Sequence, residues 1–173
     1  SEHERRQVRV LHLIAAYRNR GHQVAKLDPL GIMEREAVQD LELAHHGLSK
    51  SDLDTVFQTG NLFLGKPEAT LREIVDCLKG TYCSTVGCEY MHIVNTAEKR
   101  WLQQRLEGVR SHPQYGADIK SHILERLTAA EGLEKYLGSR YPGTKRFGLE
   151  GGESMIPLMD EMIQRVGSYG AKE

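Results

Sequence analysis

Residues 145–153, KRFGLEGGE, carry the strongest chemical signal in the sequence. Lys145 and Arg146 stand before a short extended stretch, and a pair of glycines then leads into a helix. A glycine-rich approach to a helix N-terminus presents unpaired backbone N–H groups and a favourable dipole to anions. An arginine beside it can hold a phosphate or carboxylate with two hydrogen bonds. The pattern predicts an anion site, although Glu150 and Glu153 could satisfy the same helix end within the chain.

Histidines and cysteines give weaker signals. His45 and His46 are adjacent, so on a helix their side chains point about 100° apart and cannot easily face one ion. Cys88 could act as a nucleophile only with a nearby base such as His92, and Cys83 and Cys88 have no second cysteine pair to complete a zinc site. Buried, unreactive thiols are the usual alternative. We expect no metal ligands and no catalytic residues in this chain.

The composition excludes several functional classes. The 173 residues include 23 Lys and Arg against 24 Asp and Glu, a net charge of -1, which removes any whole-chain case for nucleic-acid binding. No apolar run approaches the roughly 18 residues that a membrane span needs. Three cysteines fit a reducing compartment better than a disulfide framework. The chain opens at Ser1 without a methionine, and both ends suggest a piece of a longer protein.

Apolar residues at helical spacing predict six or so helices with little strand. The first spans 4–20, and Gly21 is expected to end it in the left-handed conformation. A second helix is expected to begin at Ser49 or Ser51 and to place Leu53, Val56 and Phe57 on its apolar side. The remaining expected helices span 70–82, 97–110 with Thr96 as N-cap, 117–137 and 153–167.

Three further features qualify this helical pattern. The first helix carries Val10, Leu11, Ile14 and Tyr17 at core spacing. Its arginines, Arg18 among them, are interpreted as a solvated face, with contact to an anionic partner as the alternative. Residues 85–93 mix β-branched residues with Gly87 and remain ambiguous. The last helix is apolar nearly all round, so we expect it to be buried in the intact protein.

Six motifs occur in a fixed order along the chain. They are RGHQ at 20–23, LDPLG at 27–31, EYMHI at 89–93, EKRW at 98–101, LTAAEGLE at 127–134 and KRFGLEG at 145–151. Any one of them is a weak signal, but six in order at matching spacing are specific. Together they closely resemble the N-terminal part of the 2-oxoglutarate dehydrogenase decarboxylating components, from about residue 8 to residue 163.

The resemblance implies a function for the full-length enzyme. It depends on thiamine diphosphate and magnesium, decarboxylates 2-oxoglutarate in the citric acid cycle, and passes the succinyl group to a lipoyl group on dihydrolipoyl succinyltransferase. The family forms a homodimer. The resemblance maps Arg146 to a cofactor-binding position, places Phe147 and Leu149 in the same pocket, and makes Glu150 structural. The Gly-Asp-Gly element that holds magnesium is missing from these residues, so we expect them to bind no cofactor and to be inactive alone.

The resemblance also implies a fold and a domain organisation. We expect a mainly α chain, with a helical N-terminal domain over 1–137. Residues 138–173 would be a loop and helix leading into the edge of a thiamine diphosphate-binding α/β domain that is otherwise absent.

One departure from the family bears on regulation and localisation. Animal mitochondrial versions carry a proposed calcium site, but the matching positions here are Gln23, Glu36 and Val38. Glutamine and valine are poor calcium ligands, so we expect no calcium regulation. This favours a bacterial cytoplasmic enzyme, with the mitochondrial matrix as the location if the source is eukaryotic.

Two alternatives to this interpretation stay open. One is a non-catalytic helical module that serves only interaction or docking. The other is a homologue that acts on 2-oxoadipate.

Overall fold

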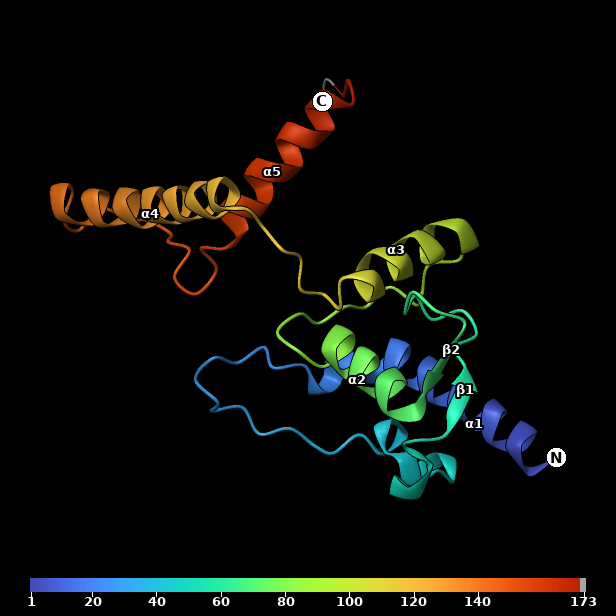
Figure 1. Cartoon of the computed structure of the whole chain (residues 1–173). Coiled ribbons are helices and arrows are strands. Elements are labelled where there is room, and N and C mark those ends of the chain that lie inside the picture. Colours follow the sequence, from blue (N-terminus) through green and yellow to red (C-terminus); the bar gives the residue numbers. More distant parts are fainter. Residues whose placement is uncertain (172–173) are drawn as a thin grey trace. The chain divides into compact units, whose positions relative to one another are not determined.

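The computed structural model describes residues 1–171, and over this range the chain is mainly α, as predicted (Figure 1). The helices are α1 (Glu2–Arg20), α2 (Leu71–Tyr82), α3 (Thr96–Gly108), α4 (Ala117–Arg140) and α5 (Met155–Ser168). Two compact units are formed, Ser1–Pro113 and the residues from Gln114 onward. The predicted domain division after residue 137 concerns a longer protein and stays a prediction.

The core of the first unit lies between α1 and α2. Helix α1 begins with a capping box, in which the Ser1 hydroxyl accepts the N–H of Glu4. Val10, Leu13 and Ile14 on α1 pack with Ile74 and other apolar residues of α2, and all are almost fully buried. Burying each such side chain stabilises the fold by about 1.5–3 kcal/mol. Leu11, expected in this core, is 41% exposed instead, because it lies on the flank of the buried stripe.

Gly21 ends α1 for a different reason from the one predicted. Its backbone is right-handed, with φ of -56°, and the chain continues into the short 3₁₀ helix η1 (Gly21–Val24). A Cβ atom at position 21 would lie 2.5 Å from the Cβ of Tyr82. Glycine is therefore needed for the close approach of the ends of α1 and α2, not for a left-handed turn.

The helix predicted after Ser49 is wrong. Ser49 forms a capping box with Asp52, but the helix is the single 3₁₀ turn η4 (Lys50–Asp52). Strand β1 (Val56–Gln58) follows and pairs antiparallel with β2 (Glu68–Thr70), with Phe57 opposite Ala69. Val56 is half-exposed and Phe57 is buried, the alternation of a strand. Two further 3₁₀ turns precede this ribbon, η2 (Gln39–Leu41) and η3 (Leu43–His46), and residues 85–93 form neither helix nor strand.

Helix α3 begins as predicted but with a different cap. Oδ1 of Asn95, not the Thr96 side chain, accepts the N–H groups of Ala97 and Glu98, at 2.9 and 3.3 Å. Trp101 is 52% exposed, and the guanidinium of Arg105 lies 3.8 Å from its ring centroid. The tryptophan is therefore sheltered by a cation–π contact rather than by the core.

The second unit consists of α4, α5 and the irregular segment between them. The two helices contact each other, yet no described residue from 114 onward is buried. The apolar side chains of both helices face solvent, among them Leu124, Leu133, Leu158 and Ile163, each at least 59% exposed. Burial of the last helix in an intact protein stays a prediction. Over the described range, no helix is both long and apolar enough to cross a membrane.

Candidate functional site

The loop that carries Arg146 is held against α4 by one residue, Glu134. Nη1 of Arg146 donates a hydrogen bond of 2.6 Å to the backbone carbonyl of Glu134. The carboxylate of Glu134 accepts the backbone N–H of Leu149, also at 2.6 Å. A Cβ at Gly138 would lie 2.6 Å from Nη1 of Arg146, so glycine there lets the guanidinium lie against the helix. The structure thus brings Arg146 and Leu149 to the same point on α4.

Phe147 does not join them. Its ring is 88% exposed, with Nζ of Lys145 5.5 Å from the ring centroid, whereas Leu149 is partly buried. The carboxylate of Glu153 accepts the N–H of Gly151 at 3.2 Å, so one N–H group near the start of α5 is satisfied within the chain. This agrees with the alternative to an anion site given above for Glu153. Of the three predicted cofactor-binding residues, two share an anchor and one points to solvent.

This loop fits one edge of an anionic group. The Arg146 side chain is exposed, and the described structure gives its guanidinium a single hydrogen bond, so N–H groups remain for a phosphate or carboxylate oxygen. Residues 1–171 hold no cluster of three or more His, Cys, Asp or Glu side chains that could bind a metal ion. The arrangement can therefore contact an anionic oxygen, and the absence of metal ligands from this chain stays a prediction.

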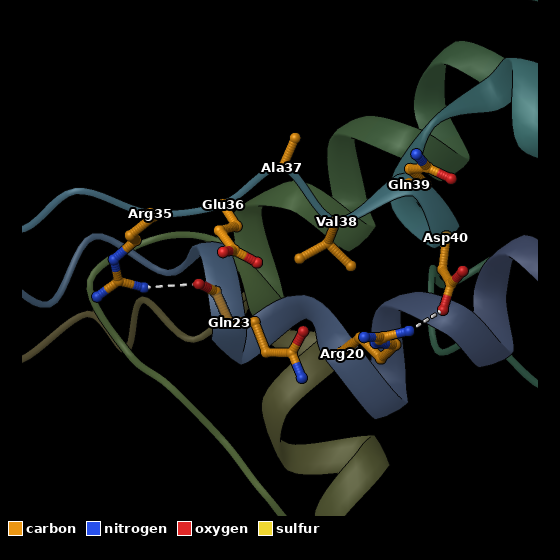
Figure 2. A pocket seen from close by; sticks show the side chains of 8 residues that line it. All are labelled: Arg20, Gln23, Arg35, Glu36, Ala37, Val38, Gln39 and Asp40. Carbon is orange, nitrogen blue, oxygen red and sulfur yellow. Dashed lines mark hydrogen bonds and ion pairs between the residues drawn. The ribbon is translucent and has the colours of Figure 1, made fainter.

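A hollow of about 420 Å³ lies where the end of α1 meets residues 35–40 (Figure 2). It brings together Gln23, Glu36 and Val38, the positions that match the calcium site proposed for animal mitochondrial versions. Arg20 is ion-paired with Asp40, and this hydrogen bond lowers the pKa of the Asp40 carboxyl. Nη1 of Arg35 donates to the carbonyl of Gln23 at 2.9 Å. Two guanidinium groups line the hollow, which disfavours a bound cation; the absence of calcium regulation stays a prediction.

The predicted solvated face of α1 is wrong at Arg18, which is 5% exposed. Its Nε and Nη2 donate to the two carboxylate oxygens of Glu107 on α3, at 2.7 and 3.0 Å. The same carboxylate accepts the hydroxyl of Tyr82 at 2.7 Å and the N–H of Phe63 at 2.9 Å. Burial, reinforced by the charge of Glu107, raises the pKa of Tyr82 well above its usual range. Sequence reasoning missed this network, which joins α1, α2 and α3.

The weaker candidates behave as buried or isolated groups. The rings of His45 and His46 lie edge to face with centroids 5.2 Å apart, and Nε2 of His46 is 2.8 Å from the carbonyl of Asp40. The cysteines are free thiols, and burial raises the pKa of Cys83 to about 11. A raised pKa leaves little reactive thiolate at neutral pH.

Comparison with known proteins relates this helical chain to one class of enzyme component. No family model matches it. It is 62% identical over all 173 residues to the 2-oxoglutarate dehydrogenase E1 component of Azotobacter vinelandii and 51% identical to that of Cupriavidus necator, covering 18% of each. Identity to the component of Brucella anthropi is 44% over 167 residues, 17% of that protein.

The whole chain is therefore homologous to a part of dehydrogenase E1 components. More particularly, it is similar throughout its length to a part of the 2-oxoglutarate dehydrogenase E1 component, which confirms the resemblance carried by the six motifs. It spans less than a fifth of the length of these relatives.

Proposed function

We propose that this chain is the N-terminal part of an enzyme that oxidatively decarboxylates 2-oxoglutarate and passes the succinyl group to a lipoyl domain. The observation that carries the proposal is the 62% identity that extends over all 173 residues. Identity of this level without interruption supports the same role for the same segment.

Within that enzyme, we assign Arg146 to the edge of the cofactor site. Thiamine diphosphate would supply an electron sink for the electron pair that stays on the substrate when the carboxylate leaves as carbon dioxide. Arg146, anchored by the carbonyl of Glu134, would direct its remaining N–H groups at an anionic oxygen of the cofactor or substrate. Leu149, fixed by the Glu134 carboxylate, and Phe147 would supply apolar surface beside it. The magnesium ligands would come from the rest of the enzyme.

The proposed assembly follows from the same identification. The partner is dihydrolipoyl succinyltransferase, the intact enzyme is a homodimer, and the setting is the bacterial cytoplasm. The bacterial origin of the relatives supports this setting. Residues 1–173 alone are expected to decarboxylate nothing and to bind no cofactor, because an ion pair made by one exposed guanidinium contributes only about 0–1 kcal/mol in water.

A chimera tests the proposal. Residues 1–173 replace the matching segment of the Azotobacter vinelandii E1 component, and turnover is measured with 2-oxoglutarate and with 2-oxoadipate, beside the unaltered relative. We expect activity with 2-oxoglutarate within about tenfold of the relative. A folded chimera that is inactive with both substrates would support a docking role only, and a preference for 2-oxoadipate would reassign the substrate.

A further inference from the structure

Ser84 and His112 form a side-chain pair that the proposed function does not use. Ser84 follows α2, and His112 follows α3, so two loops that are 28 residues apart in sequence meet here. Oγ of Ser84 lies 3.2 Å from Nε2 of His112. The serine is half-buried and the imidazole is exposed, so a small molecule in solution can reach both.

The second ring nitrogen of His112 determines the direction of this hydrogen bond. Nδ1 lies 2.6 Å from the backbone carbonyl of Arg110. A carbonyl oxygen only accepts, so Nδ1 carries the proton, and in the neutral ring Nε2 is left with a lone pair. The Ser84 hydroxyl is therefore the donor, and Nε2 is placed to take its proton.

Backbone hydrogen bonds fix the two loops that carry Ser84 and His112. Arg110 and Ser111, just before His112, have φ values of 50° and 52°. Residues other than glycine rarely adopt this left-handed backbone conformation. The turn is closed by the N–H of Ser111 on the carbonyl of Leu106, at 2.9 Å. The carbonyl of Ser84 accepts the N–H of Lys26 at 2.6 Å. Strained backbone of this kind is concentrated at functional sites.

From this geometry we infer that Ser84 is a nucleophile activated by His112, reactive towards activated acyl esters and phosphonyl fluorides. Oγ forms a bond to the acyl carbon or the phosphorus as its proton passes to Nε2 of His112. The bond to the leaving group breaks, and an alkoxide or fluoride departs with the electron pair; the proton on Nε2 then passes to the alkoxide, or to water when fluoride leaves. This is the pairing of nucleophile and base, with the base oriented by a third group, that activates serine in general. The inference does not depend on the proposed function.

The test is labelling of the whole chain with a biotin-tagged fluorophosphonate, followed by mass spectrometry of the peptides. Ser139 and Ser168 serve as internal controls, because they are exposed and their hydroxyls donate to the carbonyls of Tyr136 and Arg165. We expect Ser84 to be labelled at least about tenfold faster than either, since general-base assistance is typically worth about 10²–10⁴. Equal labelling of the three serines overturns the inference without any variant.

Variants then show whether fast labelling of Ser84 depends on His112 as a base or only on the exposure of Ser84. His112→Asn is expected to lower the Ser84 rate at least about tenfold and to leave Ser139 unchanged. The matched control is His12→Asn, on the exposed side of α1, which should change neither rate. Circular dichroism checks that both variants are folded. A folded His112→Asn chain that labels Ser84 at the original rate rejects the assignment.

Discussion

At the scale of single residues, Arg146 has two roles that must be separated. Its hydrogen bond to the Glu134 carbonyl ties the 141–154 segment to α4, and its remaining N–H groups are proposed to face an anion. A purely structural arginine would affect stability, whereas an anion-binding one would affect kinetics. Kinetics measured beside thermal stability distinguish the two, and substitution by lysine tests whether the planar guanidinium is needed rather than the charge alone.

We predict that Arg146→Ala in the chimera weakens the use of cofactor or substrate by about tenfold to a few hundredfold. Charge-assisted hydrogen bonds are worth roughly 1.5–3 kcal/mol each. Arg146→Lys should recover only part of this loss. Steady-state kinetics beside melting curves measure both roles, with Lys135→Ala on the exposed side of α4 as control. Normal kinetic constants with a lower melting temperature would make the loop a scaffold.

Glu107 joins α1, α2 and α3 of the first unit through one buried carboxylate. We predict that Glu107→Gln destabilises this unit by about 3–5 kcal/mol, because the change leaves Arg18 charged and buried without its counter-charge. Urea unfolding followed by the fluorescence of Trp101, the single tryptophan, measures the loss.

Two comparisons sharpen that measurement. Asp54→Asn neutralises an exposed pair with Arg72 in the same unit and should change stability by no more than about 0.5 kcal/mol. The double change Arg18→Met with Glu107→Leu should cost less than Glu107→Gln alone, since no charge is left unpaired. If Glu107→Gln and Asp54→Asn unfold at the same urea concentration, the buried pair of Arg18 and Glu107 contributes no more than an exposed pair.

At the scale of elements, α2 begins with a capping box formed by Thr70 and Glu73. The Thr70 hydroxyl accepts the N–H of Glu73, and the Glu73 carboxylate accepts the N–H of Thr70 at 2.9 Å. The other carboxylate oxygen accepts Nζ of Lys66 at 2.6 Å. The hydrogen bond from Lys66, followed by that from Thr70, lowers the pKa of Glu73 from 4.5 to about 2.

This cap gives a pH dependence of known sign. The pKa of Glu73 is lower in the folded than in the unfolded chain, so its stabilising contribution is complete above pH 4.5 and is lost as pH falls to about 2. We predict that the stability difference between the unaltered chain and Glu73→Gln shrinks across this window. Urea midpoints measured at several pH values check it, with Glu34→Gln in the exposed loop as control. A difference independent of pH would contradict the prediction.

Helices could be predicted from the sequence wherever apolar residues recur at helical spacing over a long stretch, as they do for α1, α2 and α4. The prediction of a helix over Val56 and Phe57 failed for a physical reason. Strand β1 forms by pairing with β2, which lies twelve residues further along the chain, and this pairing cannot be seen in the local pattern. The burial of Glu107 could not be predicted for a related reason. A charged residue on a helix normally faces water, and its partner Arg18 lies 89 residues away in the sequence. The Arg146 segment could be found from its residue types, but its anchor on Glu134 depends on tertiary contact.

At the scale of the whole molecule, the two units differ in what stabilises them. The first has a contiguous core, while no described residue of the second is buried. Helices without a buried face are marginally stable in water. We predict that backbone amides of α4 and α5 exchange with deuterium at least about tenfold faster than those of α1 and α2.

Hydrogen exchange read by mass spectrometry at several protein concentrations tests this prediction. The first unit supplies the internal control in every sample. Protection of α4 and α5 that rises with concentration would indicate that copies of the chain shield these helices from water. Protection equal to that of α1 at high dilution would show that the second unit is stable by itself.

The buried pair of Arg18 and Glu107 also limits how the sequence can drift. Replacing either residue alone leaves the other charged and desolvated, a loss comparable to a large part of the stability of an ordinary domain. A lineage that discards the pair must therefore change both codons nearly together or first accumulate stabilising substitutions elsewhere. The same constraint applies to the groups that hydrogen-bond to this pair. They are the Tyr82 hydroxyl and the N–H of Phe63 on Glu107, and the Asn61 side chain on Arg18.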